Sequence, residues 1–361
     1  MRVLQVIARM NIGGTARYLT SLTNGLTQTG IESKIATGFV QGAESEDPSV
    51  NSVEIIRVPA LGRAINPVKD LTAIGQLQKI IREYKPDIIH THTFKAGFVG
   101  RYPKPSTKRV HTFHGHLFDD PEFSGPKSVL ITAIERSLAK KTDKLVTVGQ
   151  RVADDLLERE IGNQNQFVNI PPGVVPLVEL ERNIARTELG ISQDQVVVGW
   201  LARMTGVKNP HLALEVARAL PHIQFLMGGA GDLLAEIRSA APLNVKVLGW
   251  VDAAKFIAAS DIIFSTSEND GMPIALIEAQ LAGKPIVATD AGSVAEVVIN
   301  NQSGFVVNRN IGQIKGAIEK LISDPALRSG MGTAGKIRSS EYFATSKMIA
   351  AHISLYQSLI K

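Results

Sequence analysis

The segment Pro171-Pro172-Gly173-Val174-Val175-Pro176 interrupts the regular pattern of the chain near its middle. Proline has no backbone N–H and a fixed φ, so this segment cannot continue a helix or a central strand. On both sides of it, short apolar runs rich in valine and isoleucine alternate with longer amphipathic stretches. Such alternation is typical of βαβ units that build a parallel sheet. We therefore interpret the segment as a linker and predict two doubly wound α/β domains.

The pattern also places the individual elements. The strands predicted before the linker are Val3–Ala8, Ser33–Val40, Val53–Val58, Asp87–Thr91, Arg109–Phe113, Leu145–Val148 and Phe167–Ile170. Those predicted after it are Val196–Leu201, Ile223–Met227, Val245–Leu248, Asp261–Thr266, Pro285–Thr289 and Gly304–Val307. Helical periodicity is clearest at Asn66–Tyr84, Pro210–Leu220 and Ala275–Ala282, and the chain should be all-helical from Ile311 to a last helix, Tyr342–Ile360. The predicted domains are residues 1–172, joined by 341–361 crossing back, and residues 173–340.

Composition limits the class of protein. The 361 residues include 39 Lys and Arg against 34 Asp and Glu, which gives a formal net charge of +5. The excess lies in residues 1–172, which hold 22 basic and 17 acidic side chains. The absence of cysteine excludes thiolate nucleophiles, disulfides and iron–sulfur clusters. No apolar stretch approaches the roughly 18 residues of a membrane helix, and the first apolar run is too short for a signal peptide. We expect a cytoplasmic protein that meets a membrane only peripherally.

Two motifs of the first domain should lie at the carboxyl ends of strands. Gly13-Gly14 follows the first predicted strand and opens a helix, where backbone N–H groups and the helix dipole can hold an anion. A plain tight turn explains the glycine pair equally well. Five of the eight histidines lie in Ile88-Ile89-His90-Thr91-His92 and in His111-Thr112-Phe113-His114-Gly115-His116. Because ligands of doubly wound sheets bind outside these strand ends, the histidines are candidates for a sugar or phosphate site, with metal binding or simple packing as alternatives.

Two further motifs belong to the second domain. Arg203 and Lys208 follow its first predicted strand, and a guanidinium with an ammonium suits a diphosphate better than a single carboxylate. Asp270 and Glu278 are separated by seven residues that contain Gly271 and Pro273, where a helix should begin. The free N–H groups of that helix can hold an anion, and Glu278 can accept hydrogen bonds from hydroxyls. Two carboxylates also fit a glycosidase pair, but that class does not explain the glycine–proline helix start.

In this order the four motifs resemble the retaining glycosyltransferases of family 4, of the bacterial cell-surface polysaccharide type. The strongest likeness runs from Asp270 through Gly292 to Val298 and is similar to the family's E-x7-E region. Supporting segments are Val110 to Gly115, Ile170 to Gly173 and Met227 to Gly231. The resemblance implies the GT-B fold, in which two Rossmann-like domains face each other across a cleft and the C-terminal helix crosses back to the first.

The resemblance also implies roles for individual residues. Arg203 and Lys208 would bind the nucleotide diphosphate, Glu278 the ribose, and His114 the donor sugar near the reacting carbon. The donor-binding set is completed by Gly14, Gly229, Trp250, Val251, Asp270, Gly271, Met272, Pro273 and Ile274. The family usually has Glu where this chain has Asp270, and the side chain is shorter by roughly 1.5 Å. His114, Arg203, Lys208 and Asp270 are the predicted catalytic residues, and the role of Asp270 is the one that this departure leaves open.

The implied reaction is the transfer of a hexose from a nucleotide-diphosphate-sugar to a hydroxyl of a lipid-linked or glycan acceptor. It proceeds with retention at the anomeric carbon, by front-face displacement, and UDP is the family's commonest donor nucleotide, although GDP-mannose is an alternative. No metal or cofactor is expected, because fixed cations and a helix dipole would stabilise the departing diphosphate. The alternatives are a sugar-nucleotide epimerase with the same fold and a non-enzymatic sugar-binding protein.

The charge excess indicates a second partner. Between Lys95 and Arg151 the chain carries eleven basic and five acidic residues, with Lys140, Lys141 and Lys144 close together. Motifs that recognise nucleic acid are missing, so we expect no nucleic-acid partner. We predict instead contact with anionic lipid headgroups or a lipid-diphosphate acceptor at the inner face of the plasma membrane. A solvated basic face is the alternative.

Overall fold

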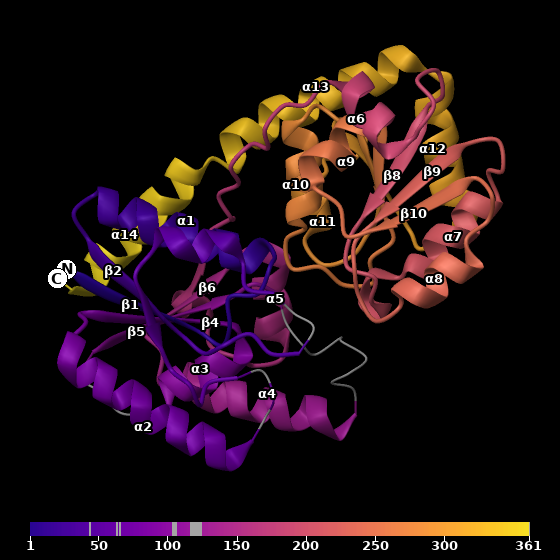
Figure 1. Cartoon of the computed structure of the whole chain (residues 1–361). Helices are drawn as coiled ribbons and strands as arrows, with labels where there is room; N and C mark the ends of the chain where they lie inside the picture. The colour runs from indigo at the N-terminus through magenta and orange to yellow at the C-terminus, as the bar shows by residue number, and fades with distance from the viewer. Residues whose placement is uncertain (43–44, 63, 65, 103–106, 116–124, 361) are drawn as a thin grey trace. The chain divides into compact units, whose positions relative to one another are not determined.

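A computed structural model describes residues 1–42, 45–62, 64, 66–102, 107–115 and 125–360 of the chain (Figure 1). These residues form two compact units. The first consists of the described residues up to Gly173 together with those from Ala344 onward, and the second begins at Val174 and ends at Phe343. His116, and Lys104 among the eleven basic residues counted between Lys95 and Arg151, lie outside the described residues.

The first unit is built on a seven-stranded sheet in the order β3-β2-β1-β4-β5-β6-β7, and its neighbouring strands pair in parallel. The strands are β1 (Arg2–Ile7), β2 (Glu32–Thr37), β3 (Ile55–Arg57), β4 (Ile88–His92), β5 (Lys108–Phe113), β6 (Lys144–Thr147) and β7 (Phe167–Asn169). The predicted strand Ser33–Val40 stops at Thr37. At Gly38 the backbone passes so close to the Leu61 carbonyl that a Cβ would collide with it.

Helices of the first unit are α1 (Gly14–Gln28), α2 (Pro67–Tyr84), α3 (Thr93–Arg101), α4 (Pro126–Ala139), α5 (Gln150–Glu158) and α14 (Thr345–Ile360), with short 3-10 turns η1 (Pro48–Ser52) and η3 (Gln164–Gln166). Helix α2 begins where the Asn66 side chain accepts a hydrogen bond from the Lys69 N–H at 3.0 Å. Helix α14 packs on α1, where a Cβ at Gly25 would collide with Ile349 (Figure 1). The prediction that the C-terminal helix crosses back to the first domain is therefore confirmed.

The second unit has a six-stranded parallel sheet in the order β10-β9-β8-β11-β12-β13. Its strands are β8 (Val197–Leu201), β9 (Gln224–Gly228), β10 (Val245–Gly249), β11 (Ile262–Ser265), β12 (Ile286–Thr289) and β13 (Gly304–Val307). Its helices are α6 (Arg182–Leu189), η4 (Gly206–Lys208), α7 (Pro210–Arg218), α8 (Leu234–Ala240), α9 (Ala253–Ala259), α10 (Ile274–Leu281), α11 (Val294–Val297), α12 (Ile311–Ser323) and α13 (Pro325–Tyr342). Trp200, Phe225 and Phe264 form the centre of its core.

The predicted last helix, Tyr342–Ile360, is in fact the end of α13 and all of α14. Helix α13 ends at Tyr342, and α14 begins at Thr345. The break coincides with the change of unit, because Phe343 belongs to the second unit and Ala344 to the first.

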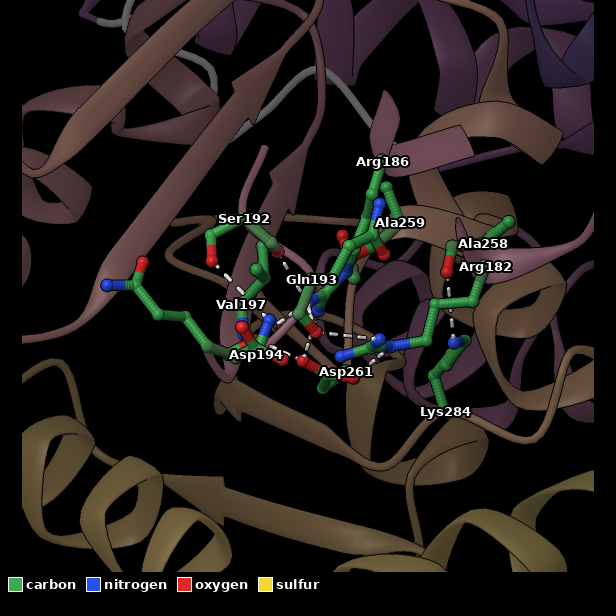
Figure 2. A network of polar contacts seen from close by, with 12 residues as sticks. Arg182, Arg186, Ser192, Gln193, Asp194, Val197, Ala258, Ala259, Asp261 and Lys284 are labelled. Atoms are coloured by element: carbon green, nitrogen blue, oxygen red, sulfur yellow. Dashed lines mark hydrogen bonds and ion pairs between the residues drawn. The ribbon is translucent and has the colours of Figure 1, made fainter. Parts of the chain in front are cut away.

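A buried polar network fixes α6 to the amino-terminal ends of β8 and β11 (Figure 2). The Arg186 side chain is fully buried, contacts Asp261 Oδ2 at 2.5 Å and donates to the carbonyl oxygens of Ala259 and Gln195. The same Asp261 oxygen accepts from the Val197 N–H at 2.8 Å. The buried guanidinium is tolerated because these contacts replace its hydrogen bonds to water. The network lies at the amino-terminal ends of the strands, whereas the predicted site lies at their carboxyl ends, so we assign the network a structural role.

Candidate functional site

The second sheet brings three predicted catalytic residues to one edge. Its strand order reverses at β8, with β9 on one side and β11 on the other, and this reversal is where doubly wound sheets bind ligands. Arg203 follows β8, Lys208 ends the 3-10 turn η4, and Asp270 follows β11. Arg203 is exposed, whereas Lys208 and Asp270 retain 17% and 15% of their side-chain exposure.

Lys208 and Asp270 form an ion pair in which the ammonium Nζ contacts the carboxylate Oδ2. The Ser267 hydroxyl lies 3.5 Å from the same carboxylate oxygen. An ammonium has three N–H donors, so the pair orients Lys208 and leaves it the capacity to bind an anion. Although it is shorter than glutamate, the Asp270 side chain therefore reaches Lys208 and positions this predicted phosphate-binding lysine.

The loop that carries Lys208 is held by residues that the sequence analysis did not single out. The Trp200 indole Nε1 donates to the Thr266 hydroxyl at 2.9 Å, and that hydroxyl shares its single proton between the carbonyl oxygens of Lys208 and Asn209, 3.0 and 2.8 Å away. Thr266 is buried and directly follows β11. The only sequence signal for this role is a hydroxyl residue at the carboxyl end of a predicted strand.

The backbone around Asp270 is fixed as tightly as its side chain. Its carbonyl accepts a hydrogen bond from the Ser293 N–H at 2.9 Å. Gly292, with φ of 51°, lies so close that a Cβ there would collide with the Asp270 carbonyl. The loop after β12 therefore needs glycine at this position, and it clamps the loop after β11.

The glycine-rich turn after β9 packs directly on the loop after β8. Gly229 has φ of 133°, and a Cβ there would collide with the Ala202 carbonyl. The Met204 N–H donates to the Ala230 carbonyl at 2.9 Å. This backbone-to-backbone packing places predicted donor-binding Gly229 beside the start of the Arg203 loop.

Helix α10 begins at Ile274, with Pro273 as its N-cap, one residue later than predicted. In the described part of the chain no side chain caps this helix, so its first turn presents N–H groups at the same edge of the sheet. Gly271 precedes it and is partly buried, and Met272 and Pro273 are buried. Glu278 lies one turn into α10 and is only 3% exposed.

Two other predicted residues follow β10. Trp250 is 70% exposed, so its indole is free to stack on a flat ring such as a nucleotide base. Val251 is partly buried and packs over Gly228, where a Cβ would approach the Val251 Cγ1 to 2.7 Å.

The first sheet has an equivalent reversal at β1, with β2 on one side and β4 on the other. Gly13 and Gly14 follow β1, and α1 begins at Gly14 without a side-chain N-cap among the described residues. His92 ends β4, and His114 directly follows β5. The two motifs predicted for the first domain therefore lie at the same edge of this sheet.

The histidines of this unit lie in a hydrogen-bonded cluster with side chains of α14. His92 Nδ1 lies 3.1 Å from His114 Nε2, and His90 Nδ1 lies 2.6 Å from the Tyr356 hydroxyl. His352 Nε2 lies 3.1 Å from the Tyr18 hydroxyl. His114 is partly exposed, whereas His90, His92, His111 and His352 are completely buried.

Burial keeps these imidazoles neutral. It lowers the pKa of His114 to about 3, with a further contribution from His352, and it lowers the pKa of His352 to about 4. It also holds the pKa values of His90, His92 and His111 well below the usual range. In the part of the chain that the structure covers, no group of three His, Asp or Glu side chains is placed to bind a metal ion.

The basic stretch between Lys95 and Arg151 is only partly a surface. Lys95 is buried in an ion pair with Asp70, and Arg101 is fully buried against Glu135 with contacts of 2.6 and 2.8 Å. Arg109 is buried and donates to backbone carbonyl oxygens. These three cations therefore belong to the interior of the first unit. The exposed ones are Lys108, Lys127, Arg136, Lys140, Lys141 and Arg151. Among the described helices, none is both long and apolar enough to span a membrane.

Comparisons with known proteins match both units. A family model described as Glycosyltransferase Family 4 matches residues 12–176, and one described as Glycosyl transferases group 1 matches residues 181–338. The chain is 27% identical over 301 residues to the UDP-Gal:alpha-D-GlcNAc-diphosphoundecaprenol alpha-1,3-galactosyltransferase of Escherichia coli, with 77% of each chain covered.

Two solved structures are similar to nearly the whole chain. A sucrose-phosphate synthase from Thermosynechococcus elongatus matches with a TM-score of 0.86 at 18% identity and 99% coverage of both chains. Alr3699/HepE of Anabaena, solved in complex with UDP and glucose, matches with a TM-score of 0.83 at 18% identity, covering 99% of this chain and 100% of that one.

Proposed function

Because the chain belongs to family 4 of the glycosyltransferases and has the GT-B fold, we propose that it moves a hexose from a UDP-sugar to a hydroxyl of a lipid-linked or glycan acceptor. The observation that carries this proposal is the convergence of Arg203, Lys208 and the first turn of α10 at the reversal of the second sheet. The Escherichia coli relative supports the donor and acceptor classes, since its name gives UDP-Gal and a diphosphoundecaprenol-linked sugar.

We assign the donor diphosphate to Arg203 and Lys208. The guanidinium offers a planar fork of donors, and the Lys208 ammonium, held by Asp270, offers a point charge. The N–H groups of the first turn of α10 add a favourable dipole. Negative charge grows on the diphosphate as the sugar leaves, so these groups stabilise the transition state more than the bound donor.

We propose that the reaction retains configuration at the anomeric carbon. The bond from that carbon to the diphosphate oxygen breaks while a bond to the acceptor oxygen forms on the same face. The acceptor proton passes to the departing diphosphate oxygen, so the protein needs no covalent nucleophile. Fixed cations would supply the charge stabilisation that a divalent metal supplies elsewhere, and the reaction would therefore be metal-independent.

The remaining predicted residues would recognise the donor. Glu278 would accept hydrogen bonds from the ribose hydroxyls, and Trp250 with Val251 would flank the base. In the first unit, Gly14 would present its backbone to the diphosphate and His114 would contact the sugar. Asp270 would hold Lys208 with one carboxylate oxygen, while the carboxylate can still accept from a donor hydroxyl.

Turnover assays with and without acceptor test this function. The protein is incubated with each of several UDP-hexoses, alone and with a polyprenyl-diphosphate-linked N-acetylglucosamine. Release of UDP that requires acceptor, together with a new glycoside, supports the transferase. Interconversion of the UDP-sugar without acceptor identifies an epimerase instead, and binding without any reaction identifies a sugar-binding protein. A GDP-mannose arm tests the choice of nucleotide.

We further propose that the protein works in the cytoplasm, at the inner face of the plasma membrane. The support is local: α4 exposes Val129 and Leu130 by 72% and 61%, next to the exposed Lys127, and Lys140 and Lys141 follow the same helix. Basic residues near an anionic surface contribute up to about 1 kcal/mol each. Sedimentation with phosphatidylglycerol vesicles at low and high salt tests the proposal, with phosphatidylcholine vesicles as control. Binding that is independent of both lipid charge and salt would contradict it.

A further inference from the structure

A continuous string of hydrogen bonds joins the C-terminal helix α14 to His114. It runs from Thr112 through the side chains of His90, Tyr356 of α14, Gln5 and His92 to His114. A separate contact on the same helix joins His352 to the Met348 carbonyl and to Tyr18. Every side chain of this string except His114 is buried. Because each neutral imidazole has one donor and one acceptor nitrogen, the direction of one bond fixes the direction of the next.

A backbone carbonyl fixes the tautomer of His352. A carbonyl oxygen only accepts, so His352 donates from Nδ1 to the Met348 carbonyl at 2.8 Å, and its Nε2 must accept. The Tyr18 hydroxyl, 3.1 Å away, therefore gives its single proton to His352. In the string itself the Gln5 amide sets the direction, because its nitrogen only donates and its Oε1 only accepts.

The other contacts follow from Gln5. Its amide donates to the Tyr356 oxygen at 3.4 Å, so the buried Tyr356 hydroxyl gives its proton to His90 Nδ1 at 2.6 Å, and His90 Nε2–H donates to Thr112 at 2.7 Å. Gln5 then presents its carbonyl Oε1 to His92 Nε2–H at 2.8 Å. His92 Nδ1 is left as an acceptor, and it takes the Nε2–H of His114 at 3.1 Å.

We propose that Gln5 and His92 are positioning residues that hold His114 in a single tautomer, protonated at Nε2 and bearing a lone pair at Nδ1. His114 is then a hydrogen-bond acceptor for the hydroxyl group it meets. This inference rests on the proposed function for the identity of that hydroxyl, which would belong to the donor sugar. Tyr356 of the C-terminal helix supports this arrangement by accepting from the Gln5 amide, although it lies more than two hundred positions after His114 in the sequence.

The tautomers can be observed directly in the unliganded protein. Labelling with 15N-histidine and recording long-range 1H–15N correlations distinguishes protonated from unprotonated ring nitrogens, and single histidine substitutions assign the signals. The string predicts protonation at Nε2 for His90, His92 and His114, and the Met348 carbonyl predicts protonation at Nδ1 for His352. Any of the three rings of the string with its proton on the other nitrogen would overturn the proposal.

Two substitutions of similar size at Gln5 test its role. Gln5→Leu removes the acceptor for His92 Nε2–H and leaves that donor buried without a partner, which favours moving the His92 proton to Nδ1 and reversing the His92–His114 bond. His114 should then show protonation at Nδ1. Gln5→Glu keeps a carbonyl oxygen for His92, so its His114 signal should match the native protein. An unchanged His114 tautomer in Gln5→Leu would overturn the proposal.

Kinetics give a second readout. Loss of one neutral hydrogen bond to the donor corresponds to a fall in kcat/KM of up to about tenfold in Gln5→Leu, with recovery in Gln5→Glu. The two proposals fail separately. If no UDP-hexose is transferred but the three tautomers of the string are as predicted, the proposed function is wrong and the string stands. If transfer is found and the tautomers differ, the string is wrong and the function stands.

Discussion

Lowering the pH from 7 to 5 is expected to destabilise the first unit and to spare the second. The first unit contains five histidines whose pKa values are lowered by removal from water, four of them completely buried and one, His114, partly exposed: His90, His92, His111, His114 and His352. In the unfolded chain each returns to a pKa of about 6.5. Below that pH the unfolded state binds more protons than the folded state. The free energy of unfolding therefore decreases as the pH is lowered, until the pH reaches the pKa values of the histidines in the folded state.

The size of this loss of stability follows from the pKa values of His114 and His352. At pH 5 an unfolded histidine gains about 2 kcal/mol from protonation relative to one that stays neutral. His114 and His352, with pKa values of about 3 and about 4, remain neutral at pH 5 in the folded unit. They therefore remove about 4 kcal/mol together, and the other three act in the same direction. Since single domains are stable by about 5–15 kcal/mol, this loss is large enough to open the unit.

Hydrogen exchange read by mass spectrometry separates the two units. Protection of β1, β4 and β5 should fall sharply between pH 7 and pH 5, after correction for intrinsic exchange, while β8 and β11 keep theirs. Trp200 and Trp250 both lie in the second unit, so the tryptophan fluorescence of that unit should change little over the same range. His222→Gln, at an exposed position of the second unit, is the control variant and should leave the pH profile unchanged.

Two results would contradict the expected acid sensitivity of the first unit. Constant protection of the first sheet between pH 7 and pH 5 would show that the buried histidines are not held neutral. An equal loss in both units would assign the acid sensitivity to groups other than this cluster.

Four further outcomes are expected. Lys208→Ala should lower kcat by about 10²-fold or more, the scale of losing one preorganised donor, and near-native turnover would remove Lys208 from the diphosphate site. Thr266→Val should lower kcat by less, because it frees the Lys208 loop but keeps the ammonium; a loss equal to that of Lys208→Ala would contradict a positioning role. Gly25→Ala should destabilise the first unit by about 1–3 kcal/mol in urea unfolding, because its Cβ meets Ile349, whereas Gly75→Ala, where a Cβ meets open space, should not. Turnover should persist in EDTA, and loss restored by a divalent ion would show that the reaction uses a metal.

The alternation of Val- and Ile-rich runs was enough to predict both parallel sheets, because strands covered on both faces leave a continuous apolar signal. Strand ends were predicted less well. The end of β2 at Thr37 coincides with the close approach of Leu61 to Gly38, and the helix break at Phe343 coincides with the change of unit. Both are tertiary effects that local pattern does not contain.

For the candidate site, too, the sequence predicted the placement of residues but not their contacts. Arg203, Lys208 and Asp270 could be predicted because each follows a strand, and strand ends of a parallel sheet meet at one edge. The contact of Asp270 with Lys208 and the support from Thr266 needed the packed structure. Charge counting was misleading at Lys95, whose ammonium is buried against Asp70 rather than exposed.

The partners of the histidine cluster were also hidden from the sequence. His90 and His92 stood out as strand-end histidines, but Tyr356 and His352 lie more than two hundred residues away on an amphipathic helix. From the sequence alone, their polar groups are expected on the exposed face of that helix. In the structure α14 packs against α1 and both side chains are buried. Only long-range packing makes them interior hydrogen-bond partners.

We propose that this chain transfers a hexose from a UDP-sugar with retention, using fixed positive charge in place of a nucleophile. The anomeric configuration of the product, measured by 1H NMR after reaction of an α-linked UDP-hexose with a polyprenyl-diphosphate-linked acceptor, tests it most directly. We expect a new α-glycoside formed in EDTA, in step with release of UDP. A β-glycoside, or consumption of the UDP-hexose without any glycoside, would contradict it.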